Sequence, residues 1–188
     1  MARQIDTAKQ VRFALATTLT SLAKEAQHAS VSETERAFTV RNNWLQPSNA
    51  MGIKVLPASK EDLSAAVATR ADWLVPFQEG GTKTPKGANL AIPTKNVRRT
   101  KRDVIRKTQR PNALRGKRTF LLPTKNGLVL FQRKGRGKRS TITALYRLKP
   151  SARIQKRSTV VEPTLRVFGR RFDGVFEGQL RKAFATAR

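Results

Sequence analysis

Apolar residues recur every three or four positions near both ends of the chain, as they do on one face of an amphipathic helix. The first stripe predicts a helix over residues 6–27, with Asp6 as its N-cap, and consists of Val11, Leu15, Leu19, Leu22 and Ala26. The second stripe is rich in Phe and predicts a helix over residues 163–187. Its members are Leu165, Phe168, Phe172, Val175, Phe176, Leu180 and Phe184.

The last helix has mixed local signals. Pro163 suits its first turn, whereas three glycines lower its intrinsic stability: Gly169, Gly174 and Gly178. Its stability must therefore come from packing, either on the first helix or on a neighbouring subunit.

Between the two helices, residues 39–161 read as a β-rich core. Just before this core, Ser32 and Glu35 have the spacing of a capping box, which predicts a short second helix through Phe38. Short apolar runs bounded by Gly, Pro and Asn then predict strands over residues 53–56, 63–67, 89–93, 119–123, 127–132 and 141–148. The first two runs would form a hairpin. Asn126-Gly127 is a strong hairpin signal, so the last three would form a meander.

These elements predict an α+β fold in a single domain over residues 1–188. We expect a small antiparallel β-sheet or barrel, flanked by long N-terminal and C-terminal helices and carrying long basic loops. Residues 94–118 stand out as a long basic insertion in this core, and loops of that length are usually functional or disordered.

Charge is unevenly distributed along the chain. There are 39 Lys and Arg against 12 Asp and Glu, a formal net charge of +27. Eight of the acids precede Gly80, whereas residues 80–161 contain 24 basic residues and the single acid Asp103. Such a chain repels itself and favours a negatively charged partner. Nucleic acid is the usual one, and an acidic protein surface or an anionic membrane are the others.

Two basic segments are candidates for that contact, residues 94–118 and the glycine-rich loop at residues 133–139. In both, a solvated surface is the competing interpretation. The side chains that we expect close to DNA or facing a partner are Lys95, Arg98, Arg99, Lys101, Arg102, Arg106, Lys107, Arg110, Arg133, Lys134, Arg136, Lys138 and Arg139. Phe120 and Phe131 lie only at the margins of these segments, so base stacking on an aromatic platform is not expected.

Catalytic chemistry is not expected from this composition. The chain has no cysteine and one histidine, His28, which suits a helix C-terminus. Its carboxylates read as caps, turns or exposed helix positions, and none has the context of an acid–base pair or a metal cluster. We therefore expect no enzyme, no metal and no cofactor. No apolar run has the roughly 18 residues of a membrane span, and no secretory signal is evident, so we expect synthesis in the cytoplasm and no membrane partner.

The order of elements resembles the tail-completion and neck proteins of tailed bacteriophages, including the minor tail protein Z group. The resemblance rests on Phe77-Gln78-Glu79-Gly80-Gly81, the basic Thr- and Pro-rich stretch from Thr82 to Lys86, the strand from Leu90 to Pro93, and Leu145-Tyr146-Arg147-Leu148-Lys149-Pro150. The basic insertion at residues 94–118 is longer than in the family pattern, so the resemblance does not cover its role.

The resemblance implies an α+β virion protein without catalytic residues. Its subunits would form a ring, commonly a hexamer, in the neck or proximal tail. The ring would join head-completion, adaptor or portal proteins to tail terminator and tail tube proteins. Genomic DNA would pass through it, and a basic lumen would attract DNA without reading its bases. A closed ring needs a heterologous interface, in which we expect Trp73, Phe77, Phe168, Phe172 and Phe176. For Trp73, packing in the core of its own subunit is the competing and more frequent interpretation.

Two other functions compete with this hypothesis. A ribosomal or other RNA-binding protein would share the pI near 11.8 and the basic loops. The nearly equal numbers of acidic and basic residues in the first 80 positions argue against it. A DNA-processing nuclease is the competing enzyme, and plasmid cleavage with added Mg²⁺ would reveal it.

Overall fold

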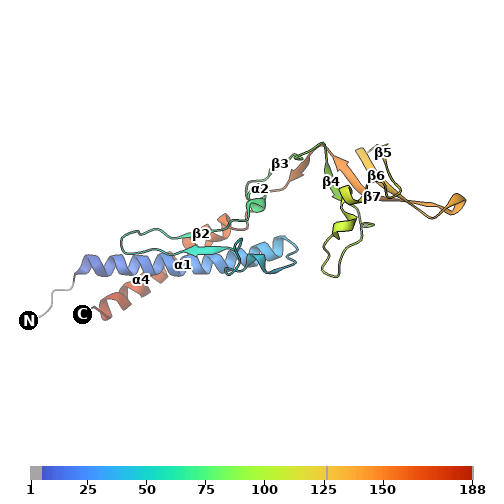
Figure 1. Ribbon diagram of the computed structural model, residues 1–188. Coiled ribbons are helices and arrows are strands. Elements are labelled where there is room, and N and C mark those ends of the chain that lie inside the picture. The colour runs from blue at the N-terminus through green and yellow to red at the C-terminus, as the bar shows by residue number, and fades with distance from the viewer. Residues whose placement is uncertain (1–5, 126, 188) are drawn as a thin grey trace, which may run out of the picture. The chain divides into compact units, whose positions relative to one another are not determined.

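A computed structural model describes residues 6–125 and 127–187 of the chain, and Figure 1 labels its helices and strands. The chain divides into two compact units. Unit 1 consists of Met1–Glu79 and Lys156–Arg188, and unit 2 consists of Gly80–Gln155. Each unit buries its own set of apolar side chains. The single domain over residues 1–188 stays a prediction.

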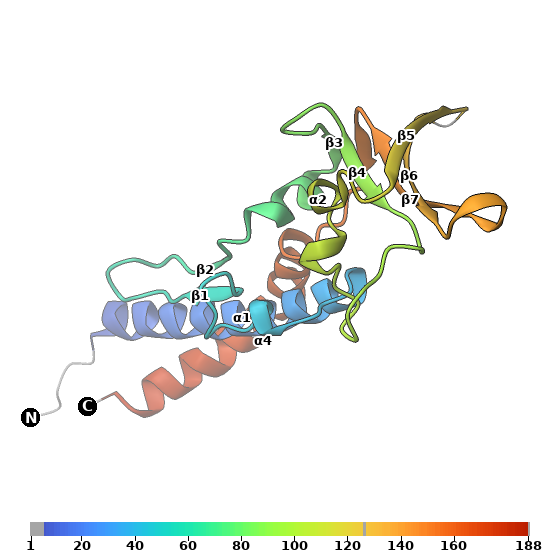
Figure 2. The ribbon, with the colours of Figure 1, turned by 45° about the vertical axis from the view of Figure 1, so that its right-hand side comes forward.

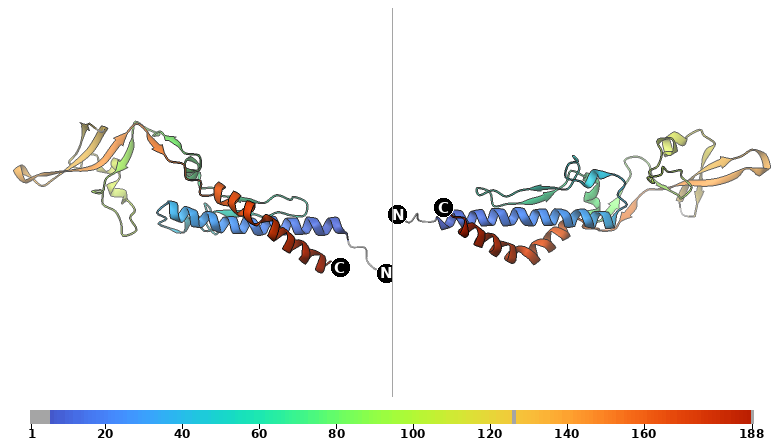
Figure 3. Two further views of the ribbon diagram at one scale, coloured as in Figure 1. Left: turned by 180° about the vertical axis from the view of Figure 1, so that it is seen from behind. Right: turned by 90° about the horizontal axis from the view of Figure 1, so that it is seen from below.

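Two long antiparallel helices form the body of unit 1, α1 at Thr7–Ala37 and α4 at Val161–Ala185 (Figures 1 and 3). Their direction follows from two contacts. The Ser30 hydroxyl donates to the carbonyl of Val160 at 3.4 Å, just before α4 begins. Further along α4, Arg171 pairs with Glu25 at 3.3 Å. Both predicted terminal helices are therefore confirmed.

Helix α1 is longer than the sequence indicates, because it continues where a second helix was expected. Ser30 and Thr34 are fully buried, and the Thr34 hydroxyl donates to the Ser30 carbonyl at 2.7 Å. The Thr34 hydroxyl is thus satisfied within the helix, and the Ser30 hydroxyl is satisfied by the carbonyl of Val160. The guanidinium of Arg157 then donates to the carbonyl of Ala37 at the helix end. The predicted break at the Ser32–Glu35 capping box is wrong.

The N-terminal end of α1 agrees with the sequence. The Asp6 carboxylate accepts a hydrogen bond from the backbone N–H of Lys9 at 3.1 Å, which confirms Asp6 as the N-cap. This hydrogen bond is the main cause that lowers the pKa of Asp6 from its ordinary value.

Short elements cover α1 in unit 1. The predicted hairpin is confirmed, with β1 at Lys54–Leu56 antiparallel to β2 at Ala66–Ala68. The side-chain amide of Gln27 donates to the carbonyl of Ile53 at 2.6 Å, which fixes the hairpin to α1. The remaining elements are the short helices η1 at Asn43–Leu45, η2 at Asp72–Leu74 and α2 at Val75–Glu79.

Helix α4 turns only part of its apolar stripe towards other residues of unit 1. Phe168, Phe172 and Phe176 are half-buried, and the rings of Phe172 and Phe176 stack at 5.8 Å. Leu165, in contrast, is 67% exposed. The predicted apolar face therefore exists, but Leu165 near its start is mostly uncovered by the described residues.

Unit 2 contains two antiparallel sheets. A two-stranded sheet pairs β3 at Gly81–Lys83 with β8 at Ala152–Ile154. The larger sheet has the order β4-β7-β6-β5 (Figure 2), and its strands are Leu90–Pro93, Thr141–Lys149, Gly127–Lys134 and Thr119–Thr124 respectively. The meander of β5, β6 and β7 is confirmed, although Asn126 of the predicted turn lies outside the described residues. The larger sheet is open, with β4 and β5 at its edges, so the barrel alternative is not realised in the described part of the chain.

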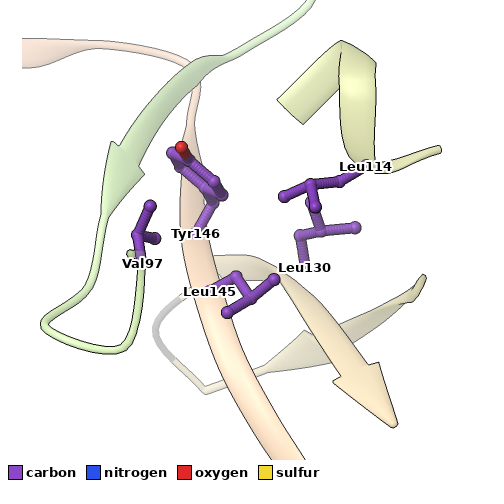
Figure 4. Packing of buried hydrophobic residues seen from close by; sticks show 5 residues of the cluster. All are labelled: Val97, Leu114, Leu130, Leu145 and Tyr146. Carbon is purple, nitrogen blue, oxygen red and sulfur yellow. The ribbon is translucent and has the colours of Figure 1, made fainter. Parts of the chain in front are cut away.

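A bulge in β7 directs two neighbouring side chains to the same face of this sheet. Leu130 pairs with Tyr146, but Phe131 pairs with Ala144, which leaves Leu145 as the extra residue. Leu145 and Tyr146 are both 2% exposed, and both pack with Leu130 (Figure 4). The bulge thus places two large side chains in one core.

The predicted α+β fold is confirmed, with helices at both ends of the chain and small antiparallel sheets between them. None of the helices described has the length and apolar character that crossing a bilayer requires.

Candidate nucleic-acid interface

Unit 2 holds most of the charge of the chain. Residues 80–155 contain 22 Lys and Arg and the single acid Asp103, which is 21 of the 27 formal net charges. The positive charge that is concentrated in one part of the sequence is therefore concentrated in one compact unit of the structure. A phosphate backbone would meet unit 2 with very little competition from carboxylates.

The basic segment at residues 94–118 packs on the larger sheet. Val97 and Leu114 are 3% and 1% exposed, and they close the core over Leu130, Leu145 and Tyr146 (Figure 4). The segment contains two short helices, η3 at Lys107–Gln109 and α3 at Pro111–Leu114. It is an ordered cover for one face of the sheet, so its basic side chains start from fixed backbone positions.

Hydrogen bonds hold both ends of this segment to the sheet. At its start, the Thr94 hydroxyl and the Asn96 amide donate to the carbonyl of Ala144, at 2.7 and 2.9 Å. Near its end, the Tyr146 hydroxyl donates to the carbonyl of Gln109 at 2.7 Å. Burial raises the pKa of Tyr146, an effect that Arg99 and Arg110 oppose.

The basic side chains of the segment point mostly into solvent. Arg99 is the exception, because it is half-buried and pairs with Asp103 at 3.3 Å across a tight turn. Asp103 has a φ of 59°, a left-handed conformation that Asp tolerates. The other predicted side chains of this segment are exposed: Lys95, Arg98, Lys101, Arg102, Arg106, Lys107 and Arg110.

The second basic segment is the loop between β6 and β7, which includes the short helix η4 at Gly137–Arg139. Gly135 has a φ of 86°, and a Cβ there would lie 3.3 Å from the Arg139 carbonyl, so the turn requires glycine. The exposed side chains in this loop are Arg133, Lys134, Arg136 and Arg139. The Lys138 side chain lies outside the described part of the structure.

The structure brings the two basic segments together at one end of the larger sheet. The Arg118 guanidinium donates to the carbonyl of Gly135 at 3.3 Å, and the backbone N–H of Arg133 donates to the Arg118 carbonyl at 2.9 Å. The side-chain amide of Gln132 also donates to the Lys117 carbonyl at 3.3 Å. The end of residues 94–118 and the start of the glycine-rich loop thus form one continuous basic region.

An aromatic pair lies in the same region, and sequence reasoning did not include it in the site. Phe120 and Phe131 pair directly across β5 and β6, with ring centroids 6.0 Å apart and an interplanar angle of 19°. The Arg133 guanidinium lies over the Phe120 ring at 5.9 Å. The register of the Asn126-Gly127 hairpin is the sequence signal that could have revealed this pair.

The residues predicted at a subunit interface belong to unit 1, where they contact one another or nearby rings. Trp73 is 42% exposed and packs edge-on against Trp44 at 4.5 Å. Phe77 packs against Phe38 at 4.9 Å. Phe172 stacks on Phe176, and Phe168 is half-buried in the same helix. Their role between subunits stays a prediction.

Within residues 6–125 and 127–187, the structure places no three acidic, histidine or cysteine side chains close enough to hold a metal ion together. The candidate site consists of cations, backbone turns and two aromatic rings.

Comparison with known proteins gives a family but no activity. Residues 1–161 match a family of unknown function, DUF6441, and the chain belongs to that family. No curated protein and no solved structure matches the chain.

Proposed function

We propose that this member of the DUF6441 family is a structural virion protein of a tailed bacteriophage. It would be a neck or tail-completion subunit that forms a ring, joins the DNA-filled head to the tail and surrounds the DNA channel. The observation that carries the proposal is the charge of unit 2, where 22 basic residues meet a single acid.

The charged surface suits DNA that moves through a channel. Exposed Lys and Arg side chains contact phosphates without regard to sequence, and the counterions that they release supply most of the affinity. The basic side chains project from an ordered sheet and its cover, so a ring of copies would present the same cations at regular intervals. A genome could then pass without being held at any preferred sequence.

A ring also explains apolar side chains that unit 1 leaves in solvent. Leu165 and Trp73 are 67% and 42% exposed. A heterologous interface repeated about a closing axis would cover such side chains in every copy. We propose a homo-oligomer, most simply a hexamer, between head-completion, adaptor or portal proteins on one side and tail terminator and tube proteins on the other.

The chain would act by binding alone, without catalytic residues, metal or cofactor, and its place in the mature particle would be the neck or proximal tail. Subunits would assemble in the host cytoplasm. The loss of such a protein stops the joining of two finished structures and leaves each of them intact.

Deletion of the gene from its source genome tests this proposal. Electron microscopy of the lysates should show full heads and complete tails that are not joined, and expression of the chain in trans should restore joined particles. Intact infectious particles without the chain would refute the proposal.

The second candidate is a ribosomal or other RNA-binding protein. The specific observation in its favour is the stacked pair of Phe120 and Phe131 beside Arg133, since aromatic side chains on a sheet are a common platform for unpaired bases. A ribosomal protein would sediment with ribosomal subunits in a sucrose gradient at moderate salt. A neck protein would sediment with tails or particles.

A further inference from the structure

The two faces of the larger sheet in unit 2 differ. Residues 94–118 cover the face that carries Leu130, Leu145 and Tyr146. Directly paired residues of an antiparallel sheet project from the same face, so the register assigns the other side chains. One row on the opposite face runs across all four strands and consists of Leu122, Val129, Arg147 and Ile92. We call this opposite face the open face.

The open face combines exposed apolar side chains with cations. Leu122 is 44% exposed, Ile142 is 53% exposed and Ile92 is 38% exposed. Arg133 pairs with Ile142 on this face, and Arg147 lies between Ile92 and Val129; both Arg side chains are exposed. The four strands contain no Asp or Glu. A surface of this kind is apolar and positive at once.

The aromatic pair lies on the open face, across the edge strand β5 and its neighbour β6. Phe120 and Phe131 are half-buried and stack on each other, with Arg133 over the Phe120 ring. On its other side, Phe131 pairs with Ala144 of β7. The methyl group of Ala144 covers less of the Phe131 ring than a larger side chain would. A planar group could therefore stack beside Phe131 above Ala144.

We propose that the open face binds single-stranded nucleic acid, with a base stacked beside Phe131 and phosphates held by Arg133, Arg147 and Lys149. Lys149 is exposed and follows Arg147 by two positions in β7, so it projects from the same face. Charge complementarity selects a polyanion as the occupant, because unit 2 has 22 basic residues and one acid. The exposed apolar and aromatic groups favour a single-stranded nucleic acid, whose unpaired bases can contact them. Duplexes hide their base faces, and protein surfaces that bind them are more polar.

This inference does not depend on the proposed function. A neck protein passes duplex DNA through a channel, and a ribosomal protein binds folded RNA, yet either could hold an unpaired strand on this face. The test therefore measures binding by the purified protein, and its outcome does not depend on whether the protein is part of a virion.

The first measurement compares two fluorescent probes by anisotropy, a mixed-sequence single-stranded DNA and the duplex of the same sequence. The account predicts at least tenfold tighter binding of the single strand at salt concentrations where phosphate contacts alone are weak. Equal affinity for the two probes would overturn the proposal. Displacement of the single strand by polyglutamate at an equal concentration of charges would overturn it too, since it would indicate a site for acidic proteins.

Matched variants assign the binding to the open face. Leu121 and Leu122 are neighbours in β5 and are 49% and 44% exposed, but they project from opposite faces. Leu122→Glu should weaken single-strand binding about tenfold or more, whereas Leu121→Glu should change it less than threefold. Equal losses in the two variants would contradict the proposal.

The stacking contact needs a separate readout. Phe131→Leu keeps an apolar side chain in the sheet and should weaken single-strand binding about tenfold while leaving duplex binding unchanged. Ultraviolet cross-linking to the unchanged protein should place the nucleotide adduct on the peptide that contains Phe131. An adduct on residues 94–118 alone would overturn the proposal. Because cross-linking uses the unchanged protein, this test remains possible even if the Phe131 variant fails to fold.

Discussion

The Tyr146 hydroxyl donates a hydrogen bond of 2.7 Å to the backbone carbonyl of Gln109. Tyr146 belongs to β7 and is 2% exposed, whereas Gln109 belongs to the basic segment at residues 94–118. One buried side chain thus ties a strongly charged segment to the sheet that supports it. Repulsion among the cations of this segment opposes its packing on the sheet, and the hydrogen bond from Tyr146 counteracts that repulsion.

Replacement of Tyr146 by Phe removes this tie and leaves the Gln109 carbonyl without its partner. We expect a loss of about 1 kcal/mol in the free energy of unfolding, the usual net contribution of one hydrogen bond, because the contact is only partly buried. Tryptic cleavage within residues 94–118 should also become faster. Thr141→Val, which removes an exposed hydroxyl from the same strand, is the control and should change neither quantity. Unchanged cleavage in Tyr146→Phe would show that the hydrogen bond does not hold the segment.

Stability should also fall at alkaline pH because of Tyr146. Burial raises the pKa of its hydroxyl above the ordinary value of 10.0. The unfolded chain therefore ionises first, so the contribution of Tyr146 is complete below about pH 10 and is lost as the pH rises through the folded pKa. Denaturant melts should show a steeper alkaline loss for the unchanged protein than for Tyr146→Phe.

The titration can be observed directly, since Tyr146 is the only tyrosine of the chain. Tyrosinate absorbance should appear at higher pH in the folded protein than in denaturant. Coincident midpoints would contradict the burial that the structure assigns to this side chain.

Much of unit 2 could be predicted because its signals are local. Asn126-Gly127 and the apolar runs beside it were enough to predict β5 and β6. The bulge at Leu145 was not visible, since it changes which face each residue of β7 occupies without changing the composition of the strand. The stacking of Phe120 on Phe131 also depends on register, and so sequence reasoning left the pair out of the site.

The cover formed by residues 94–118 could not be predicted for a different reason. Val97 and Leu114 are nearly isolated among cations, and two apolar residues at that separation form no periodic pattern. They are buried because they pack against Leu130 and Tyr146 of the underlying sheet. The continuation of α1 beyond Ser30 has a similar origin, since contact with the start of α4 outweighs the local signal for a break.

The Thr18 hydroxyl is a weak point in unit 1. Thr18 is fully buried in α1, and its Oγ1 atom has no hydrogen-bond partner among the residues that the structure describes. Thr18→Val keeps the branched shape and removes the unsatisfied group, so it should raise the free energy of unfolding by about 1 kcal/mol. Thermal melts would measure the gain.

The neighbouring residue supplies a control for this change. The Thr17 hydroxyl donates to the carbonyl of Phe13 at 2.9 Å, so Thr17→Val loses a hydrogen bond and should not stabilise the protein. Equal effects of the two substitutions would contradict the burial assigned to Thr18.

Two basic segments could face duplex DNA, and their salt dependence separates them. Arg136→Gln with Arg139→Gln removes two exposed charges from the glycine-rich loop, and Arg102→Gln with Arg106→Gln removes two from residues 94–118. The slope of log affinity against log salt should fall by about 0.9 for each phosphate contact that is lost. The segment that faces DNA should show this fall and also reduce DNA retention in particles. If neither double variant changes slope or retention, the basic channel is excluded.

Joining of heads and tails in vitro tests the neck assignment most directly. Full heads and complete tails would be purified from lysates that lack this chain, mixed, and supplied with the purified protein. The account predicts that joined, infectious particles form in proportion to the added chain until the necks are saturated, and that none form without it. Heads and tails that join equally well without the chain would contradict the assignment.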